Sequence, residues 1–374
     1  MIPISLRALP WSMLFTVVAI TALGLATLYS AAGGNITPWA SSQAVRFAAL
    51  FCGMLVLSLV PVDFWMRFAY PFYGVTLALL FVVELFGKIG MGAQRWIDLG
   101  IIRIQPSEFM KLAIVLTLAR FYHRVPPMFI SAPFVLLVPA ALIAVPAGLV
   151  MLQPDLGTAL MITMAGTLLI FMAGTYLRWF IGAGAIVIAM LPIAWGMLHD
   201  YQKNRVLIFM DPESDPLGTG YHISQSKIAI GSGGVFGKGF LNGTQSHLDY
   251  LPETHTDFIF ATMMEEWGMT GGLFVIFAYG YLIWWGLSLA LQSTSVFARL
   301  TAIGMAFTLF LYVGINLSMV MGLAPVVGIP LPLMSYGGSA MMTVLILLGI
   351  LMSIYRNNQR SHGRRGSEKR SILL

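Results

Sequence analysis

The stretch from Ala132 to Met151, APFVLLVPAALIAVPAGLVM, contains no charged side chain over 20 residues. A helix needs about 20 predominantly apolar residues to cross the hydrocarbon core of a bilayer, because each unpaired backbone polar group in lipid costs several kcal/mol. The stretch therefore predicts a transmembrane helix. Similar apolar stretches recur along the whole chain of 374 residues.

By the same rule, the sequence predicts about ten transmembrane helices. Their approximate spans are 12–32, 44–60, 68–86, 106–122, 132–151, 155–174, 178–198, 258–291, 297–321 and 336–355. The eighth is too long to lie wholly in the membrane, so we expect its first turns to stand outside or to re-enter. The expected fold class is an all-α integral membrane protein, a bundle with a large extracytoplasmic loop between helices 7 and 8. We expect one polytopic domain, residues 1–374, with the outer loop at about 199–257 and a basic cytoplasmic tail at about 356–374.

The composition excludes a soluble enzyme and a disordered chain. Hydrophobic residues make up 58% of the sequence and charged residues 10%, whereas soluble domains average about 25% charged. The net charge is +6, and six of the 21 Lys and Arg lie in the last 19 residues. A basic tail after a final apolar span is typical of a cytoplasmic anchor beside anionic lipid, not of a nucleic-acid-binding protein. An even number of helices then places both termini in the cytoplasm.

Two predicted outer loops, roughly 87–105 and about 199–257, carry unexpected positive charge. Their cations are Lys88, Arg95, Arg103, Lys203, Arg205, Lys227 and Lys238. Positive charge outside opposes the usual insertion preference. An anionic ligand on the outer face would explain it, and scattered solvated charges are the alternative.

The run GAQRWIDLGIIRIQPSEFMKLAIV, Gly92 to Val115, places charges beside the hydrocarbon. A helix that begins at Pro106 brings Glu108 and Lys111, three residues apart, to one face. Such charges are costly unless they are paired or line a wet cavity. They indicate either a functional site or an ion pair that fixes helix packing. Arg95 and Trp96 suit sugar stacking or anchoring at the interface.

Two further motifs contain an aspartate before a predicted helix and a glycine-lysine pair. In MLQPDLGTAL, capping of the following helix explains Asp155. Gly237-Lys238 fails the pattern of an ATP-binding P-loop, because Ser232 stands where its first Gly belongs and Gly239 where Ser or Thr should follow. The glycine-rich backbone with Lys227 and Lys238 could still cradle a phosphate.

An acidic cluster, His255, Asp257, Glu265 and Glu266, surrounds a helical stretch. On one helix Glu265 would lie about 80° around and about 12 Å along from Asp257. Glycoside hydrolases need two carboxylates roughly 5–9.5 Å apart, so this class is disfavoured. A single carboxylate suits sugar transfer from a lipid pyrophosphate, which needs one base and cations or a metal for the leaving group. Asp257 is the candidate base, and a helix cap is the alternative.

The last block, GLAPVVGIPLPLMSYGGSAMM from Gly322 to Met342, cannot form a regular helix because of Pro325, Pro330 and Pro332. Non-helical backbone at membrane depth must be buried in protein or line a wet cavity. This block is therefore a candidate second wall of a site.

Together, GAQRWIDLG with QPSEFMK, QPDLGTA, SHLDYLPETHTDFIFATMMEEWG and GIPLPLMSYGGS resemble the SEDS family (shape, elongation, division and sporulation). GTGYHISQSKIAIGSGG and GTQSHLDYLPE are more similar to its elongation branch than to its division branch. The resemblance implies a ten-helix peptidoglycan glycosyltransferase of the bacterial inner membrane. Such proteins polymerise lipid II on the outer face, together with a class B penicillin-binding protein and other membrane proteins of the elongation complex.

The resemblance also implies residue roles. Asp257 matches the essential acid, Trp96 the tryptophan of the RW motif, and Glu108 and Lys111 the polar pair after QPSE. Asp257 would deprotonate the acceptor GlcNAc 4-hydroxyl, which expels undecaprenyl pyrophosphate from the donor. Arg95, Lys111 and one or more of Lys203, Arg205, Lys227 and Lys238 would balance the pyrophosphate, and His255 completes the expected substrate-binding set.

Several questions stay open at this point. A divalent cation, Mg²⁺ or Mn²⁺, is an option for the pyrophosphate, and no other cofactor is expected. A lipid II flippase and a non-catalytic scaffold for the transpeptidase are the alternative functions. A base outside the hydrocarbon favours the enzyme, because moving a lipid across a membrane needs no base.

Overall fold

The computed structural model describes residues 9–86, 88–90, 93–98, 103–197, 200–211, 215, 218–248, 250 and 253–372. Seven helices in these ranges are long and apolar enough to cross a membrane. They are α1 (Trp11–Ala31), α2 (Trp39–Leu57), α3 (Val62–Phe86), α5 (Pro133–Leu152), α11 (Ile259–Gln292), α12 (Val296–Val320) and α13 (Gly338–Ile372). Two shorter apolar helices, α6 (Leu156–Met172) and α7 (Leu177–Met197), join them.

Helix α4 (Pro106–Arg124) completes the bundle, although its first 18 residues include three charged residues, Glu108, Lys111 and Arg120. It is central: α4 packs against α3, α6 and α12, and nearly all of its residues up to Ala119 are buried. Its charges therefore face protein and not lipid. The predicted all-α membrane bundle is confirmed, and the observed helices follow the ten predicted spans closely.

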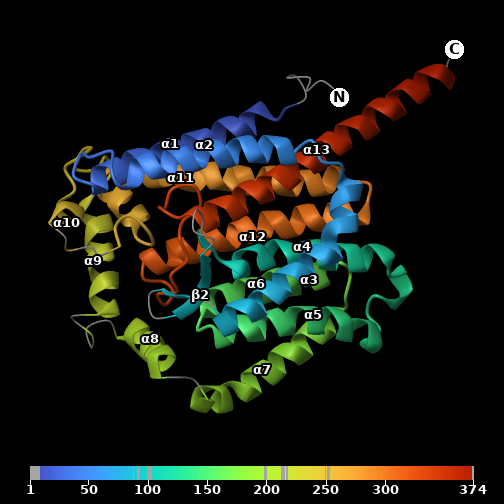
Figure 1. Ribbon diagram of the computed structural model, residues 1–374, viewed down its shortest axis with the longest axis horizontal. Helices are drawn as coiled ribbons and strands as arrows, with labels where there is room; N and C mark the ends of the chain where they lie inside the picture. Colours follow the sequence, from blue (N-terminus) through green and yellow to red (C-terminus); the bar gives the residue numbers. More distant parts are fainter. Residues whose placement is uncertain are drawn as a thin grey trace.

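The long helices run roughly alongside one another, and the connecting elements gather at one end (Figure 1). That end carries α8 (Asp200–Met210), α9 (Thr219–Ser232) and α10 (Thr244–His247). Helix α1 begins and α13 ends at the opposite end, where α13 projects beyond the other helices (Figure 1). The predicted loop at 199–257 thus contains three helices, and the basic tail continues α13 as helix to Ile372.

A small antiparallel sheet was not predicted. It has the order β1-β2-β3, with β1 (Lys88–Gly90), β2 (Ala93–Asp98) and β3 (Arg103–Ile104), and pairs Lys88 with Trp96 and Ile97 with Ile104. Strands of two to six residues are too short for an alternating hydrophobic pattern to stand out in the sequence. Strand β2 of this sheet lies against α3 and α4.

Helix α11 is broken at Gly268, whose φ of 63° and ψ of −160° are not helical. The break exposes backbone groups that the loop after α9 satisfies. Lys238 N donates to Glu265 O and Gly239 N to Glu266 O, both at 3.0 Å. Beyond the break, Met269 N donates to Gly234 O at 2.9 Å and Thr270 N to Val235 O at 3.1 Å. The loop at 233–239 is therefore clamped across the break, and the long eighth predicted helix is two helical segments.

This clamp predicts unequal effects of two glycine substitutions. Gly234 and Gly237 both have positive φ, 56° and 81°, but only at Gly237 would a Cβ collide with the backbone, at Glu266 O. We expect Gly234→Ala to cost about 1 kcal/mol from left-handed strain alone. Gly237→Ala should cost clearly more, because the loop must also move off α11. Melting temperatures of the two purified variants check this, and equal losses would contradict it.

Candidate functional site

A charged pair lies buried in the centre of the bundle. Lys111 Nζ donates to Glu108 Oε1 at 2.5 Å, with the two side chains 1% and 7% exposed. The Tyr312 hydroxyl of α12 donates to the other oxygen, Glu108 Oε2, and Lys111 Nζ lies 4.1 Å from the centre of the Tyr312 ring. Each charge thus has partners on two sides, which buried charges require. The sequence predicted the pair on one face of α4 and gave no signal for Tyr312.

A second cluster forms where the turn before α11 meets the proline-rich segment that follows α12. Tyr336 N donates to His255 O at 2.8 Å, and Ser335 Oγ donates to Thr256 O at 2.7 Å. Asn316 Nδ2 of α12 donates to Asp257 O at 3.0 Å and to Ile329 O at 2.7 Å. The backbone carbonyl groups of His255, Thr256 and Asp257 therefore each accept a hydrogen bond from a different residue. The turn that carries Asp257 is held rigidly.

Helix α12 connects the two clusters. Tyr312 and Asn316 are four residues apart, so they lie on one face about 6 Å apart along the axis. Both are fully buried. Two neighbouring turns of α12 therefore contact the Glu108–Lys111 pair and the backbone of Asp257.

The side chain of Asp257 is half-buried, and the N-cap position of α11 belongs to the next residue, Phe258. Exposed Gly328 stands opposite: a Cβ there would lie 3.5 Å from Asp257 Oδ2. Because Gly328 has no side chain, its backbone can lie close beside the carboxylate.

Aromatic rings surround His255. Trp39 of α2 stacks on the imidazole with ring centres 4.2 Å apart and planes inclined by 6°. Tyr336 lies 6.2 Å away on a tilted plane, and the Arg46 guanidinium lies over the Tyr336 ring at 4.9 Å. Burial lowers the pKa of His255, and Glu253 partly opposes that shift. The imidazole is therefore neutral at pH 7.

The QPDLGTA turn has the structural role that was predicted for it. Asp155 caps α6: Oδ1 accepts from Thr158 N at 3.1 Å, and Oδ2 accepts from Gln105 Nε2 at 3.0 Å. Arg95 also belongs to this turn, since Nε donates to Gln153 O at 3.0 Å and Nη2 donates to Pro154 O. Two guanidinium donors of Arg95 thus hold backbone, and half-buried Trp96 follows it on β2.

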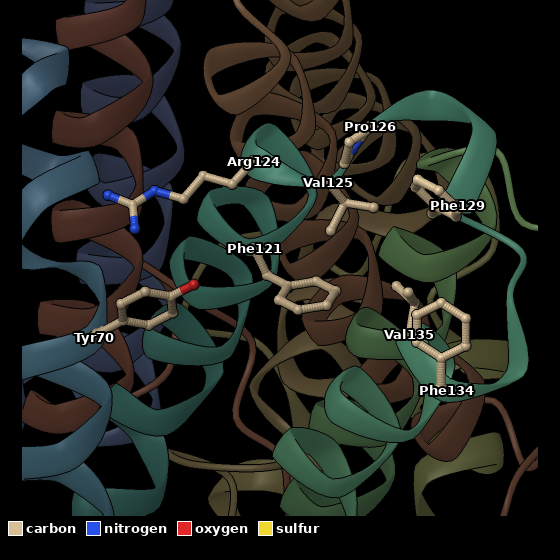
Figure 2. Close-up of a pocket in the computed structure, with 8 residues that line it drawn as sticks. All are labelled: Tyr70, Phe121, Arg124, Val125, Pro126, Phe129, Phe134 and Val135. Atoms are coloured by element: carbon tan, nitrogen blue, oxygen red, sulfur yellow. The ribbon is translucent and has the colours of Figure 1, made fainter.

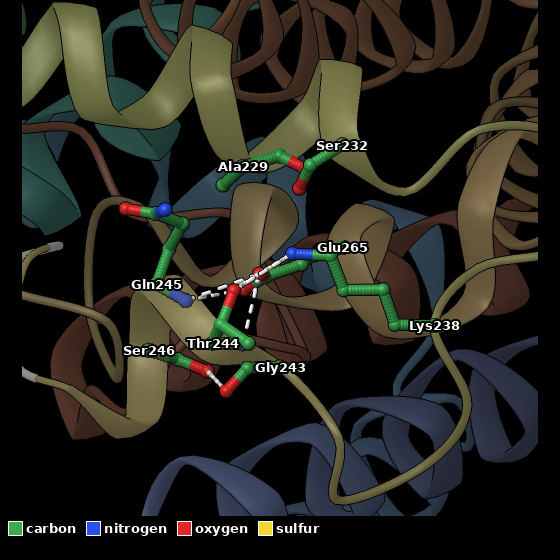
Figure 3. A network of polar contacts seen from close by, with 8 residues as sticks. All are labelled: Ala229, Ser232, Lys238, Gly243, Thr244, Gln245, Ser246 and Glu265. Carbon is green, nitrogen blue, oxygen red and sulfur yellow. Dashed lines mark hydrogen bonds and ion pairs between the residues drawn. The ribbon is translucent and has the colours of Figure 1, made fainter.

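Glu265 anchors the outer loop (Figure 3). Its Oε1 accepts from Lys238 Nζ at 2.6 Å, from Thr244 N at 2.9 Å and from Gln245 N at 3.0 Å. Glu266, on a different side of the helix, accepts from the Ser30 hydroxyl of α1. The two acids therefore tie α11 to separate neighbours.

The glycine-rich segment does not cradle a phosphate. The backbone N–H groups of Gly237, Lys238 and Gly239 all donate to carbonyl oxygens, those of Gly233, Glu265 and Glu266. No backbone donor of these three residues remains for an anion, so this expectation was wrong. It failed because the sequence does not reveal the break in α11 that uses these groups.

The remaining predicted cations differ in their surroundings. Lys227 of α9 is exposed. Its Cδ would lie 3.1 Å from a Cβ at Gly322, so the aliphatic part of its side chain lies against the start of the proline-rich segment. Lys203 of α8 is half-buried. The side chains of Arg205, Lys88 and Arg103 lie outside the described residues. Within the described part of the chain, no group of three or more His, Cys, Asp or Glu side chains could hold a metal ion.

The buried pair predicts a non-additive pair of substitutions. Lys111→Met leaves Glu108 buried without its cation, which should cost about 3–5 kcal/mol. Adding Glu108→Gln removes the unpaired charge and should recover most of the loss. Thermal unfolding of both variants checks this, with Arg299→Gln at an exposed position of α12 as the control. A double variant no more stable than Lys111→Met would contradict it.

His255 predicts a specific dependence of stability on pH. Its pKa in the folded protein is below the ordinary 6.5, so the folded state binds a proton less readily than the unfolded state. Its contribution to stability is complete above pH 6.5 and is lost as the pH falls through the lowered pKa. The melting temperature should therefore drop more between pH 7 and pH 5 in the wild type than in His255→Gln. Identical drops would show that His255 titrates normally.

Comparison with known proteins agrees with this architecture. The FtsW/RodA/SpoVE family, described as a cell cycle protein, matches residues 6–360. The peptidoglycan glycosyltransferase MrdB of Escherichia coli is 44% identical over 351 residues, which cover 93% of this chain and 94% of the relative. The peptidoglycan glycosyltransferase RodA of Treponema pallidum is 33% identical, with 91% and 96% covered.

Two solved structures are also similar over nearly their whole length. One chain comes from a peptidoglycan synthase complex that coordinates polymerization and crosslinking; it has a TM-score of 0.81 at 33% identity and covers 94% of this chain and 98% of its own. The other is the rod shape determining protein RodA of Thermus thermophilus, with a TM-score of 0.72 at 30% identity and coverage of 95% and 99%.

Proposed function

This chain belongs to the FtsW/RodA/SpoVE family and is a multi-pass membrane peptidoglycan glycosyltransferase, and from this premise we propose that Asp257 is its general base. The substrate is lipid II, which the enzyme polymerises into glycan strands during cell elongation. Asp257 takes the proton from the 4-hydroxyl of the acceptor GlcNAc. The hydroxyl oxygen attacks the anomeric carbon of the donor, and the bond to undecaprenyl pyrophosphate breaks.

The observation that carries this proposal is the set of hydrogen bonds that fixes the backbone around Asp257. Its backbone and that of the two preceding residues are fixed by Asn316, Ser335 and Tyr336, while its carboxylate faces the bare backbone of Gly328. A general base must be held within hydrogen-bond reach of the hydroxyl that it deprotonates. A turn whose backbone is fixed by three hydrogen bonds meets that requirement better than a mobile loop.

The leaving pyrophosphate needs positive charge nearby. The contacts that each cation makes in the structure indicate which cations are available to bind it. Lys227 is exposed beside Gly322, in the same segment that presents Gly328 to Asp257. Arg46 lies over Tyr336, next to the His255 turn. We propose these two as the first contacts of the pyrophosphate. Lys238 and Arg95 are engaged with Glu265 and with the QPD turn, so they act mainly by shaping the site.

Lys111 and Glu108 have a supporting role in this scheme. Both are buried, and their neighbour Tyr312 stands one turn from Asn316 on α12. We propose that the pair keeps α4 and α12 in register and thereby positions the Asp257 turn. Trp96 and His255 offer aromatic surface for the sugars, and Lys203 and Arg205 on α8 add positive charge at the same end of the bundle.

The partner and the location follow from the same premise. The similar chain of a peptidoglycan synthase complex supports a partner that crosslinks the strand, and we propose a class B penicillin-binding protein of the elongation complex. The start of α1 and the end of α13 lie at the same end of the bundle, opposite α9 and α10 (Figure 1). We place these termini in the cytoplasm and Asp257 at the outer face of the inner membrane.

Asp257→Asn tests the base directly. The amide has nearly the same shape but accepts no proton, and general bases typically contribute about 10²–10⁴-fold to a rate. We expect at least about a 100-fold loss of glycan polymer from purified lipid II, with the chemistry of the transpeptidase blocked. Melting temperature and co-purification with the transpeptidase should stay normal.

Asp63→Asn is the matched control, because Asp63 lies exposed in the first turn of α3, at the other end of the bundle. It should retain full polymerisation. Normal polymer from Asp257→Asn would refute the base. Loss of lipid II translocation in vesicles together with unchanged polymerisation would instead support the flippase.

A further inference from the structure

A groove of about 510 Å³ lies at the end of the bundle opposite Asp257, where α3, α4 and α5 meet. Aromatic and aliphatic side chains line most of it, and Arg124 is its one charged lining residue (Figure 2). The apolar lining residues are Tyr70, Phe121, Val125, Pro126, Phe129, Phe134 and Val135. Phe121 lies between Tyr70 on one side and Phe134 on the other (Figure 2). The groove does not belong to the site described above.

Arginines gather at this groove. Arg120 lies over the Tyr70 ring at 4.3 Å, and its Nη1 donates to Arg67 O at 2.8 Å. Arg124 projects from the last turn of α4 above Tyr70 (Figure 2). Arg67 and Arg124 are both exposed. Arg120 and Arg124 therefore bring two guanidinium groups to the Tyr70 side of an apolar groove.

These charges are not neutralised by carboxylates. In the described part of the chain, α3, α4 and α5 carry three acids, Asp63, Glu84 and Glu108. Glu108 is paired with Lys111, and Glu84 lies near the opposite end of α3. Asp63 lies one helical turn before Arg67 on α3 and about 10 Å along the axis from Tyr70, which Arg120 and Arg124 face. None of the three arginines forms an ion pair with any described residue.

We expect the groove to lie near the membrane surface, because the α4–α5 connection beside it contacts Tyr176 and Trp179. The α4–α5 connection contains Ser131, whose Oγ accepts from Tyr176 N at 3.1 Å and whose carbonyl accepts from Trp179 Nε1 at 3.2 Å. Tyr and Trp are enriched where hydrocarbon meets headgroups. A molecule that fills the groove therefore has its chain in hydrocarbon and its polar group beside the arginines.

We propose that this groove binds an anionic phospholipid of the bilayer, with the phosphodiester at Arg124 and an acyl chain along Phe121 and Phe134. Guanidinium groups bind phosphate oxygens through paired donors, and basic pockets between transmembrane helices bind anionic headgroups. A zwitterionic lipid fits less well, because its ammonium group would meet arginines with no nearby carboxylate. The lipid would fill the space between α4 and α5 and neutralise the arginine cluster.

Native mass spectrometry of the full-length protein tests this, with phosphatidylglycerol and phosphatidylcholine of the same acyl chains. We expect wild type to bind the first phosphatidylglycerol at least about five-fold more tightly than the first phosphatidylcholine, as one arginine contact implies. Arg124→Gln should abolish that preference. Val135→Trp, which fills the groove and keeps every arginine, should abolish it too.

Arg299→Gln is the control, because it removes an exposed arginine at the start of α12, outside the groove. It should leave the preference unchanged. Equal affinity for the two lipids in wild type would overturn the proposal. An unchanged preference in Arg124→Gln or in Val135→Trp would overturn it too, as would a loss in Arg299→Gln as large as that in Arg124→Gln.

Discussion

The site depends on one constraint: non-helical backbone between membrane helices must find its hydrogen bonds inside the protein. The proline-rich segment after α12 meets that constraint by pairing with the turn at His255, Thr256 and Asp257. Tyr336 and Ser335 donate from the segment, and Asn316 donates to both Asp257 O and Ile329 O. The same bonds that satisfy the backbone also fix the turn of the proposed base, so stability and positioning have one physical cause.

The bundle handles its buried charges in a similar way. Glu108 of α4 binds Lys111 of the same helix and Tyr312 of α12. Glu265 accepts hydrogen bonds from Lys238 and from two backbone amides of the outer loop. Each carboxylate is surrounded by donors, which offsets the cost of removing it from water. Both sets join segments that are far apart in the sequence. Their role in holding the bundle together accounts for charges that a lipid-facing helix would not tolerate.

The sequence predicted much of the fold, because a bilayer imposes length and hydrophobicity on each helix. Most spans agreed to within about two residues, even α4, where Pro106 marks the first turn despite the charges that follow. Helices α2 and α3 begin five and six residues before their predicted starts, and α13 extends beyond its predicted end. Capping of α6 by Asp155 was also predictable, since Asp before a helix commonly accepts from the third residue on. The small sheet and the phosphate-cradle interpretation failed, because both depend on which distant backbone supplies or uses hydrogen bonds.

The sequence by itself determined that the chain is a membrane bundle, which residues are apolar, and which charged residues, Glu108, Lys111 and Asp257 among them, stand where charge is costly. These are properties of local composition and spacing. Only the tertiary structure decided the partners: Tyr312 for Glu108, Asn316 and Gly328 for Asp257, Trp39 for His255, and Glu265 for Lys238. Such pairs join helices whose packing depends on the shape of every neighbouring side chain, and no periodicity along one segment contains that information.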